Sequence, residues 1–327
     1  MKTTLSFKEV DQVFKKFLIA DEDQMKKLLL ILVLAVMSSI AIADDIEDAS
    51  EAIKKGDYAT VLKLLHPLAE QGNARAQSYL GVMYLNGLGV IQDFKEAEKW
   101  VRMAAEQGYA KAQANLGLMY RDGKGVEQDY QKALKWLRLA TEQGDASSQS
   151  ILGLMYKNGE GVIQDYQEAL KWLLLAADQG DVNAQYILGG MYATGKGVKQ
   201  DLKEALKWHR KAGDQGYFSS QYNLGVMYEE GLDVPQDYKT AVKWYRLAAE
   251  QGDAKAQFNL GMMYATGKGV PQDYVYAHMW GDLGASNGNE DGAELRDYAV
   301  KHMTLSQLEK AQDMARECLK KKYKNCD

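Results

Sequence analysis

The chain has 327 residues, with 40 Lys and Arg against 45 Asp and Glu, and a formal net charge of −5. A general nucleic-acid-binding protein would show basic clusters and a positive balance, so the composition argues against that class. Hydrophobic residues make up 46% of the chain, which is ordinary for a soluble protein.

Residues 25–43 predict an export signal. Met25-Lys26-Lys27 precedes an apolar run at 28–37, and Ala41-Ile42-Ala43 stands directly before Asp44. A basic start, a short apolar stretch and an A-x-A site are the layout of a secretory signal peptide. The apolar run is shorter than the roughly 20 residues that a membrane-spanning helix needs. An uncleaved anchor is the alternative, but we expect no stable membrane span after cleavage.

Residues 1–24 do not fit the region upstream of a signal peptide. We interpret them as an over-extended reading frame with Met25 as the true start, and the alternative is an unusually long N-terminal region of the signal peptide. The style of the signal and the short architecture indicate a bacterial protein. The expected location is therefore periplasmic or secreted.

Residues 44–71 read as a partial repeat that caps the start of an array. Tyr58 stands 36 residues before Phe94, and Leu64 stands 36 residues before Trp100. We expect a capping helical hairpin whose second helix is bent or broken by Pro67, because proline removes a backbone donor and clashes with the preceding turn.

Residues 72–287 contain six units of one period. All tryptophans of the chain are 36 residues apart, and a tyrosine and a glycine column keep the same step. Six units at a fixed period predict a solenoid rather than a single globular core. The tryptophans are Trp100, Trp136, Trp172, Trp208, Trp244 and Trp280.

Each unit is expected to hold two helices, which in the first unit cover 74–86 and 93–107. Apolar residues recur at helical spacing in both segments. Gly87 suits the left-handed position that ends the first helix. Asp93 and its equivalents in later units are suited to accept the unpaired N–H groups that begin the second helix.

Residues 288–327 break the period and are predicted to be C-terminal capping helices. One helix is expected over 289–302, and Thr304-Leu305-Ser306-Gln307 is a capping-box signature for another that runs to about Lys322. Its predicted apolar face runs from Leu305 to Leu319. A terminal cap is needed because the last repeat would otherwise expose its apolar face to water.

Both cysteines, Cys318 and Cys326, lie in this last segment. In an exported protein they can form a disulfide that closes a short loop and pins the tail. Free thiols in a cytosolic chain are the alternative.

The repeated pattern A-x-x-x-LG-x-MY-x-x-G-x-GV-x-x-D-Y-x-x-A-x-x-W, followed by A-x-x-QG, resembles the Sel-1-like repeat, a relative of the tetratricopeptide repeat. The resemblance covers residues 72–287 in six copies. It implies an all-α fold, a right-handed α-solenoid of antiparallel helix pairs whose first helices line the concave side. It also implies an adaptor or scaffold role. Some secreted members with a cysteine pair in every repeat are linked to β-lactam binding or hydrolysis, but this chain has no repeat cysteines.

No linear motif predicts an active site. The four histidines show no H-E-x-x-H or other metal-ligand spacing, and neither G-x-S-x-G nor a phosphate-binding G-x-x-x-x-G-K-[ST] occurs. The aspartate before each second helix stands at a cap position rather than in a carboxylate pair. We therefore predict no enzyme, no cofactor and no metal.

Two features of the first helices are candidate contacts for a protein or peptide partner. Two units carry a lysine one helical turn before an asparagine, and the two positions share a helix face. In the related tetratricopeptide modules, these types at these positions can bind a peptide's carboxylate and main chain. Solvated polar residues are the alternative. The pairs are Lys111 with Asn115 and Lys255 with Asn259.

The second feature is aromatic. Tyr186, Tyr222 and Phe258 replace the small residues Ser78, Ala114 and Ser150 at one repeat position. Exposed aromatic residues can anchor a partner, and local repacking is the alternative.

The sequence favours an exported repeat scaffold that binds a protein or peptide through its concave surface. An enzyme or binding protein acting on cell-wall or β-lactam compounds is one alternative, and a secreted effector that engages a host partner is another. A pocket combining Ser, Lys and Glu from several repeats would favour the enzyme.

Overall fold

The computed structural model describes residues 45–326, and the expectations for residues 1–24 and 25–43 lie outside this range. Every regular element of the described range is a helix, which confirms the all-α prediction. Two compact units divide the chain at Ser148, within α8 (Ala146–Asn158). Each unit is considered by itself.

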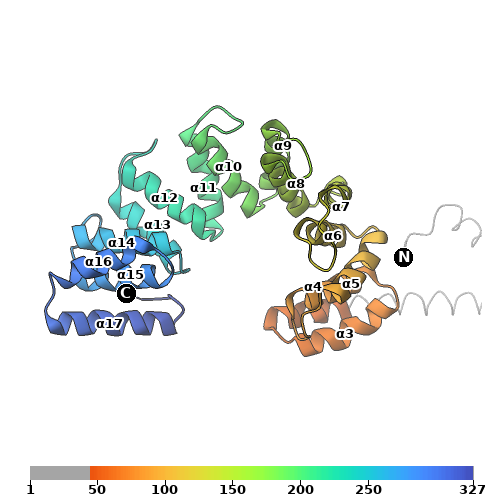
Figure 1. Cartoon of the computed structure of the whole chain (residues 1–327), viewed down its shortest axis with the longest axis horizontal. Helices are drawn as coiled ribbons and strands as arrows, with labels where there is room; N and C mark the ends of the chain where they lie inside the picture. Colours follow the sequence, from red (N-terminus) through yellow and green to blue (C-terminus); the bar gives the residue numbers. More distant parts are fainter. Residues whose placement is uncertain (1–44, 327) are drawn as a thin grey trace, which may run out of the picture. The chain divides into compact units, whose positions relative to one another are not determined.

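The first unit contains a helical segment over 45–55 and the start of the repeat array. Within each repeat the first helix packs against the second, as α4 does against α5 in Figure 1. The named helices of this unit that precede α8 are α3 (Tyr58–Glu70), α4 (Ala74–Asn86), α5 (Phe94–Glu106), α6 (Ala110–Asp122) and α7 (Tyr130–Glu142).

The second unit continues the array and ends in the two predicted capping helices. Here too each first helix packs against its second helix, and each second helix packs against the next first helix, as α11 does against α12. After α8 its helices are α9 (Tyr166–Asp178), α10 (Val182–Thr194), α11 (Leu202–Asp214), α12 (Phe218–Glu230), α13 (Tyr238–Ala249), α14 (Ala254–Thr266), α15 (Tyr274–Ser286), α16 (Glu290–Val300) and α17 (Leu305–Lys320).

The predicted caps begin and end the helices. Asp93 accepts hydrogen bonds from the backbone N–H groups of Lys95 and Glu96, and the equivalent aspartates before α7, α9, α11, α13 and α15 act in the same way. Gly87 ends α4 in the left-handed conformation, with φ of 67°. Thr304 and Gln307 form the expected capping box of α17. A short carboxylate or hydroxyl at these positions replaces the hydrogen bonds that a helix end lacks.

A glycine column sets how closely the two helices of a repeat approach. A Cβ added to Gly153 in α8 would lie 2.7 Å from Cγ of Leu173 in α9. Any side chain there would push the helices apart. The leucine and methionine that flank this column fill the core, as shown by Leu152 and Met155, which are fully buried.

Two expectations about the caps differ from the structure. Of the two outcomes expected at Pro67, a bend or a break, the break does not occur, because α3 continues to Glu70. The proline lies in the last turn, so the hydrogen bond lost through its missing N–H and the clash of its ring with the preceding turn affect only the C-terminal end of the helix. Leu305 does not lie on the buried face of α17, because its side chain is 81% exposed while Ala311, Ala315 and Cys318 are buried. At about 100° per residue, Leu305 lies about 120° around the helix from Ala311.

Candidate functional site

The first Lys–Asn pair lies on α6 in the first compact unit. Lys111 is exposed and Asn115 is half-buried one turn later. The ammonium group of Lys111 acts on the phenol of Tyr79. Burial raises the pKa of Tyr79, but hydrogen bonds with Arg75 and Ser50 and the charges of Arg75 and Lys111 outweigh it and lower the pKa overall. Lys111 therefore belongs to a small cationic cluster on the first helices.

The second Lys–Asn pair lies on α14 in the second unit, and its asparagine already has partners. Lys255 is exposed, whereas Asn259 is half-buried and hydrogen-bonded to the phenols of Tyr222 and Tyr245. The Tyr245 hydroxyl donates to Oε2 of Glu229 at 2.7 Å. Burial, together with the Glu229 carboxylate, strongly raises the pKa of Tyr245. Asn259 thus combines a candidate binding role with a structural role that Asn115 does not share.

The three aromatic side chains, which we call the aromatic row, lie on α10, α12 and α14. Tyr186, Tyr222 and Phe258 are all partly exposed. The small residues at the same position in earlier repeats are buried, with exposed fractions of 5%, 6% and 5% for Ser78, Ala114 and Ser150.

Several neighbours of the aromatic row are also aromatic or apolar. The ring centroids of Tyr186 and Tyr217 are 5.1 Å apart, and Tyr217 stacks on Phe218. Phe258 lines a groove of about 390 Å³ between α14 and α16, together with Met262 and Tyr298. The second unit therefore presents aromatic surface on its first helices.

His209 is a residue of this region that the sequence analysis did not select. It is 2% exposed and occupies the position of Val101, Leu137 and Leu173 in earlier repeats. Its Nε2 lies 3.3 Å from Nδ2 of Asn223, and its Nδ1 lies 3.4 Å from Oγ of Ser220. Burial lowers its pKa to about 4. The detectable signal was a histidine at a position where the three preceding repeats carry an aliphatic residue.

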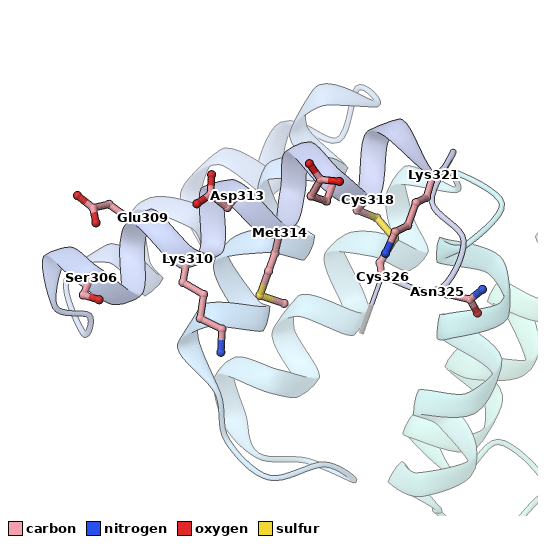
Figure 2. Close-up of a pocket in the computed structure, with 10 residues that line it drawn as sticks. Ser306, Glu309, Lys310, Asp313, Met314, Cys318, Lys321, Asn325 and Cys326 are labelled. Carbon is pink, nitrogen blue, oxygen red and sulfur yellow. A yellow bond between two sulfur atoms is a disulfide. The ribbon is translucent and has the colours of Figure 1, made fainter.

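The two cysteines are joined by a disulfide in the structure, with their Cα atoms 5.0 Å apart. Figure 2 shows the bond beside a pocket of about 520 Å³, lined by α17 and the tail that follows it. Cys318 and Cys326 are both buried. The hydroxyl of Tyr323, within the closed loop, donates to Oδ1 of Asn287 at 2.9 Å. The disulfide loop thus holds the tail against the end of α15.

No catalytic cluster stands out in these sites. Among residues 45–326, no group of three His, Cys, Asp or Glu side chains is placed to hold a metal ion. In the same range, no helix has the length and apolar character required to cross a bilayer.

Solved structures with the same fold include two proteins that are at least 31% identical to this chain. A Sel1 repeat protein from Oxalobacter formigenes is 35% identical, with a TM-score of 0.68, over 74% of this chain and 99% of that chain. The protein c5321, a protective antigen present in uropathogenic Escherichia coli strains and displaying an SLR fold, is 31% identical. That match covers 82% of this chain and 66% of the other, with a TM-score of 0.51. No curated protein sequence matches the chain.

The repeats themselves match one family model. The Sel1 repeat is found at residues 74–109, 110–145, 146–181, 182–217, 219–253 and 254–289. Proteins built from this repeat are generally non-catalytic scaffolds of a protein-interaction fold. The 36-residue period, the glycine-mediated helix packing and these matches agree, and the chain belongs to the Sel1 repeat family.

Proposed function

We propose that this Sel1 repeat scaffold binds an extended segment of a protein partner along its first helices, on the surface that the family resemblance implies is concave. The aromatic row is the observation that carries the proposal. Three consecutive repeats place Tyr186, Tyr222 and Phe258 at the surface where earlier repeats bury a small residue. Partly exposed aromatic side chains are favourable anchors, because they bury a large area at low cost in conformational entropy.

The Lys–Asn pairs supply polar contacts in this proposal. Lys111 and Lys255 are exposed cations, and each stands one turn before a half-buried amide. Within residues 45–326, neither lysine has an ion-pair partner within 4.0 Å. An ammonium group attracts carboxylates, and an asparagine can donate to and accept from a peptide main chain. Asn259 is already hydrogen-bonded to two tyrosines, so we expect Asn115 to be the amide that is more available to bond a peptide main chain.

Selection from a displayed library of random twelve-residue peptides tests this function. Peptides that bind the chain should lose about tenfold in affinity for the variant Tyr186→Ser/Phe258→Ala, since loss of a central aromatic anchor costs more than about 1 kcal/mol. Fluorescence anisotropy measures the affinities. Both substitutions copy residue types found at this position in earlier repeats.

The matched control is Leu175→Ser/Leu247→Ser, which removes exposed apolar side chains from the second helices α9 and α13. Its affinity should equal that of the unmodified chain. If no peptide is enriched, or if both double variants weaken binding equally, the first helices are not the binding surface.

We also propose that the chain is exported to the periplasm or beyond. The signal-like composition of residues 25–43 and the paired cysteines support this location. The chain recovered from its own cells should begin at Asp44 and contain no free thiol. Mass spectrometry of the intact protein, with and without a thiol-alkylating reagent, measures both properties. A chain that begins at Met1 or Met25 and takes up two alkyl groups would contradict export.

A further inference from the structure

Gly190 in α10 is a helix-interior glycine that neither the backbone nor the packing requires. The other repeats carry a larger side chain at this position: Val82, Leu118, Leu154, Val226 and Met262. Gly190 is absent from the residues with positive φ, and a Cβ added there would meet no atom within 4 Å. A glycine inside a helix costs about 1 kcal/mol relative to alanine. Stability therefore gives no reason for this residue.

The missing side chain borders a cleft of about 450 Å³, which we call the Gly190 cleft. It lies wholly within the second compact unit and is bounded by residues of α8, α10 and α12, with two loop residues and the start of α9. A leucine at position 190, as in the two preceding repeats, would project toward this open space. The volume lies within the range of about 300–1,000 Å³ that is typical of ligand sites.

The charge of the Gly190 cleft is of one sign. Lys157 and Lys196 are its charged lining residues, and no carboxylate is among the residues that line it. Lys157 is half-buried, and no ion pair joins it to another residue of the range 45–326 within 4.0 Å. In α6 the equivalent residue Arg121 pairs with Asp122 at 2.7 Å, but the residue after Lys157 is Asn158. The cleft thus lacks the counter-charge that another repeat supplies.

The polar residues of the cleft include an asparagine whose side-chain orientation is fixed by a buried histidine. Asn223 lines the cleft, and its Nδ2 lies 3.3 Å from Nε2 of the buried His209. An asparagine carries two donors and an acceptor oxygen, so this contact leaves one N–H and the carbonyl oxygen for a ligand. Tyr186 of the aromatic row lines the same cleft. Cation, amide and aromatic ring are therefore gathered at one place.

We propose that the Gly190 cleft binds a carboxylate group of an extended polypeptide segment. The carboxylate lies between Lys157 and Lys196, the adjacent main chain bonds Asn223, and Tyr186 packs against an apolar part of the segment. The inference rests on the proposed function for the ligand being a polypeptide, and it adds the site and the charge of that ligand. The carboxylate belongs to an acidic side chain or to a C-terminus, since both offer the same two oxygens.

Three fluorescein-labelled probes test the site on the full chain: a glutamate-rich decapeptide with an amidated C-terminus, a neutral decapeptide with a free C-terminal carboxylate, and the same neutral decapeptide amidated. Anisotropy is measured at 50 mM and 300 mM NaCl. One of the first two probes should bind at least tenfold more tightly than the third, and the tighter of the two identifies the source of the carboxylate. Affinity should fall at the higher salt concentration, because salt screens charges that are exposed to solvent.

Two variants locate the binding. Gly190→Leu fills the cleft with the residue found at this position in α6 and α8. It should lower the affinity for the preferred probe at least tenfold. It should not lower thermal stability, because leucine is a better helix former than glycine. Lys157→Gln/Lys196→Gln should lower the affinity for the preferred probe at least tenfold and remove most of the salt dependence of that affinity. The controls Val226→Leu and Lys268→Gln alter the same repeat positions outside the cleft and should bind as the unmodified chain does.

The proposal is overturned if neither carboxylate probe binds more tightly than the neutral amidated probe, or if Gly190→Leu binds the preferred probe unchanged. Library-selected peptides separate this failure from failure of the proposed function. If they still bind through the aromatic row, only the carboxylate site is wrong. If no peptide of any composition binds, the scaffold proposal has failed as well.

Discussion

His209 shows how a single residue can depart from its repeat column and remain buried. The glycine opposite it, Gly189, leaves room for the ring, since an added Cβ would lie 2.6 Å from imidazole atoms. A neutral imidazole has one donor and one acceptor nitrogen, which match the hydroxyl of Ser220 and the amide of Asn223. The same site in the next repeat holds Tyr245, whose hydroxyl is bonded to Glu229. Polar groups that replace aliphatic residues here are thus paired rather than orphaned.

The buried imidazole predicts a loss of stability in mild acid. Burial lowers the pKa of His209 from 6.5 to about 4. Between pH 6.5 and pH 4, the unfolded chain therefore binds a proton at this residue and the folded chain does not. The stability is fully present above pH 6.5 and falls as the pH approaches 4, by at most about 3 kcal/mol at 1.36 kcal/mol per pKa unit. Urea unfolding of the chain and of His209→Leu, at pH 7.5, 6 and 5, measures the difference.

The leucine variant copies the residue found at this position in the two preceding repeats. It should lose less stability than the unmodified chain between pH 7.5 and pH 5, whatever its stability at neutral pH. Parallel pH profiles for the two proteins would show that His209 titrates normally in the folded chain.

At the scale of elements, a buried glutamine joins three successive helical segments in five of the repeats. Nε2 of Gln221 in α12 donates to the carbonyl oxygen of Gly213 in α11 at 3.0 Å, and its Oε1 accepts from Gln251 after α13 at 2.8 Å. Gln221 is 3% exposed. The same two-step pattern recurs at Gln77, Gln113, Gln185 and Gln257. Because an unpaired buried amide costs about 1–3 kcal/mol, this column fixes the register of successive helices as well as their contact.

The sequence predicted the helices well because their signals are local. Asp93, Gly87 and the Thr304–Gln307 box each act within four residues, and their cap geometry was confirmed. The partners of Asn259 and Asn223 lie on other helices, 14 residues or more away in the sequence. The sequence therefore does not distinguish an asparagine of this column that faces solvent from one that is hydrogen-bonded to another helix. The Gly190 cleft could be suspected from one glycine in a bulky column, but its lysines come from different repeats and only the fold brings them together.

At the scale of the whole molecule, the chain is a series of repeats, and within each compact unit successive repeat helices pack together, as α5 does against α4 and α6. In such arrays stability is approximately a sum of repeat terms and nearest-neighbour interface terms. The last interface is therefore exposed unless a different element covers it. Here α16 and α17 pack on α15, and the loop after α17 is closed by the disulfide between Cys318 and Cys326. That loop holds Lys322, Tyr323 and Asn325 at φ of 52°, 66° and 51°, a region that costs non-glycine residues about 1–2 kcal/mol each.

Reduction of the disulfide should therefore loosen the terminal cap and leave the first unit unchanged. Closing a loop with a sequence separation of 8 stabilises the folded state by about 2–3 kcal/mol through the entropy of the unfolded chain. Without this constraint, the left-handed residues can relax and Tyr323 can leave Asn287. Hydrogen exchange with and without a reducing agent should show lost protection in α17, a smaller loss in α15, and none in α4 and α5.

The variant Cys318→Ser/Cys326→Ser is the control. Its exchange should match that of the reduced protein and should not change when the reducing agent is added. Equal exchange in the oxidised and reduced forms would show that packing of α17 on α15 holds the cap by itself.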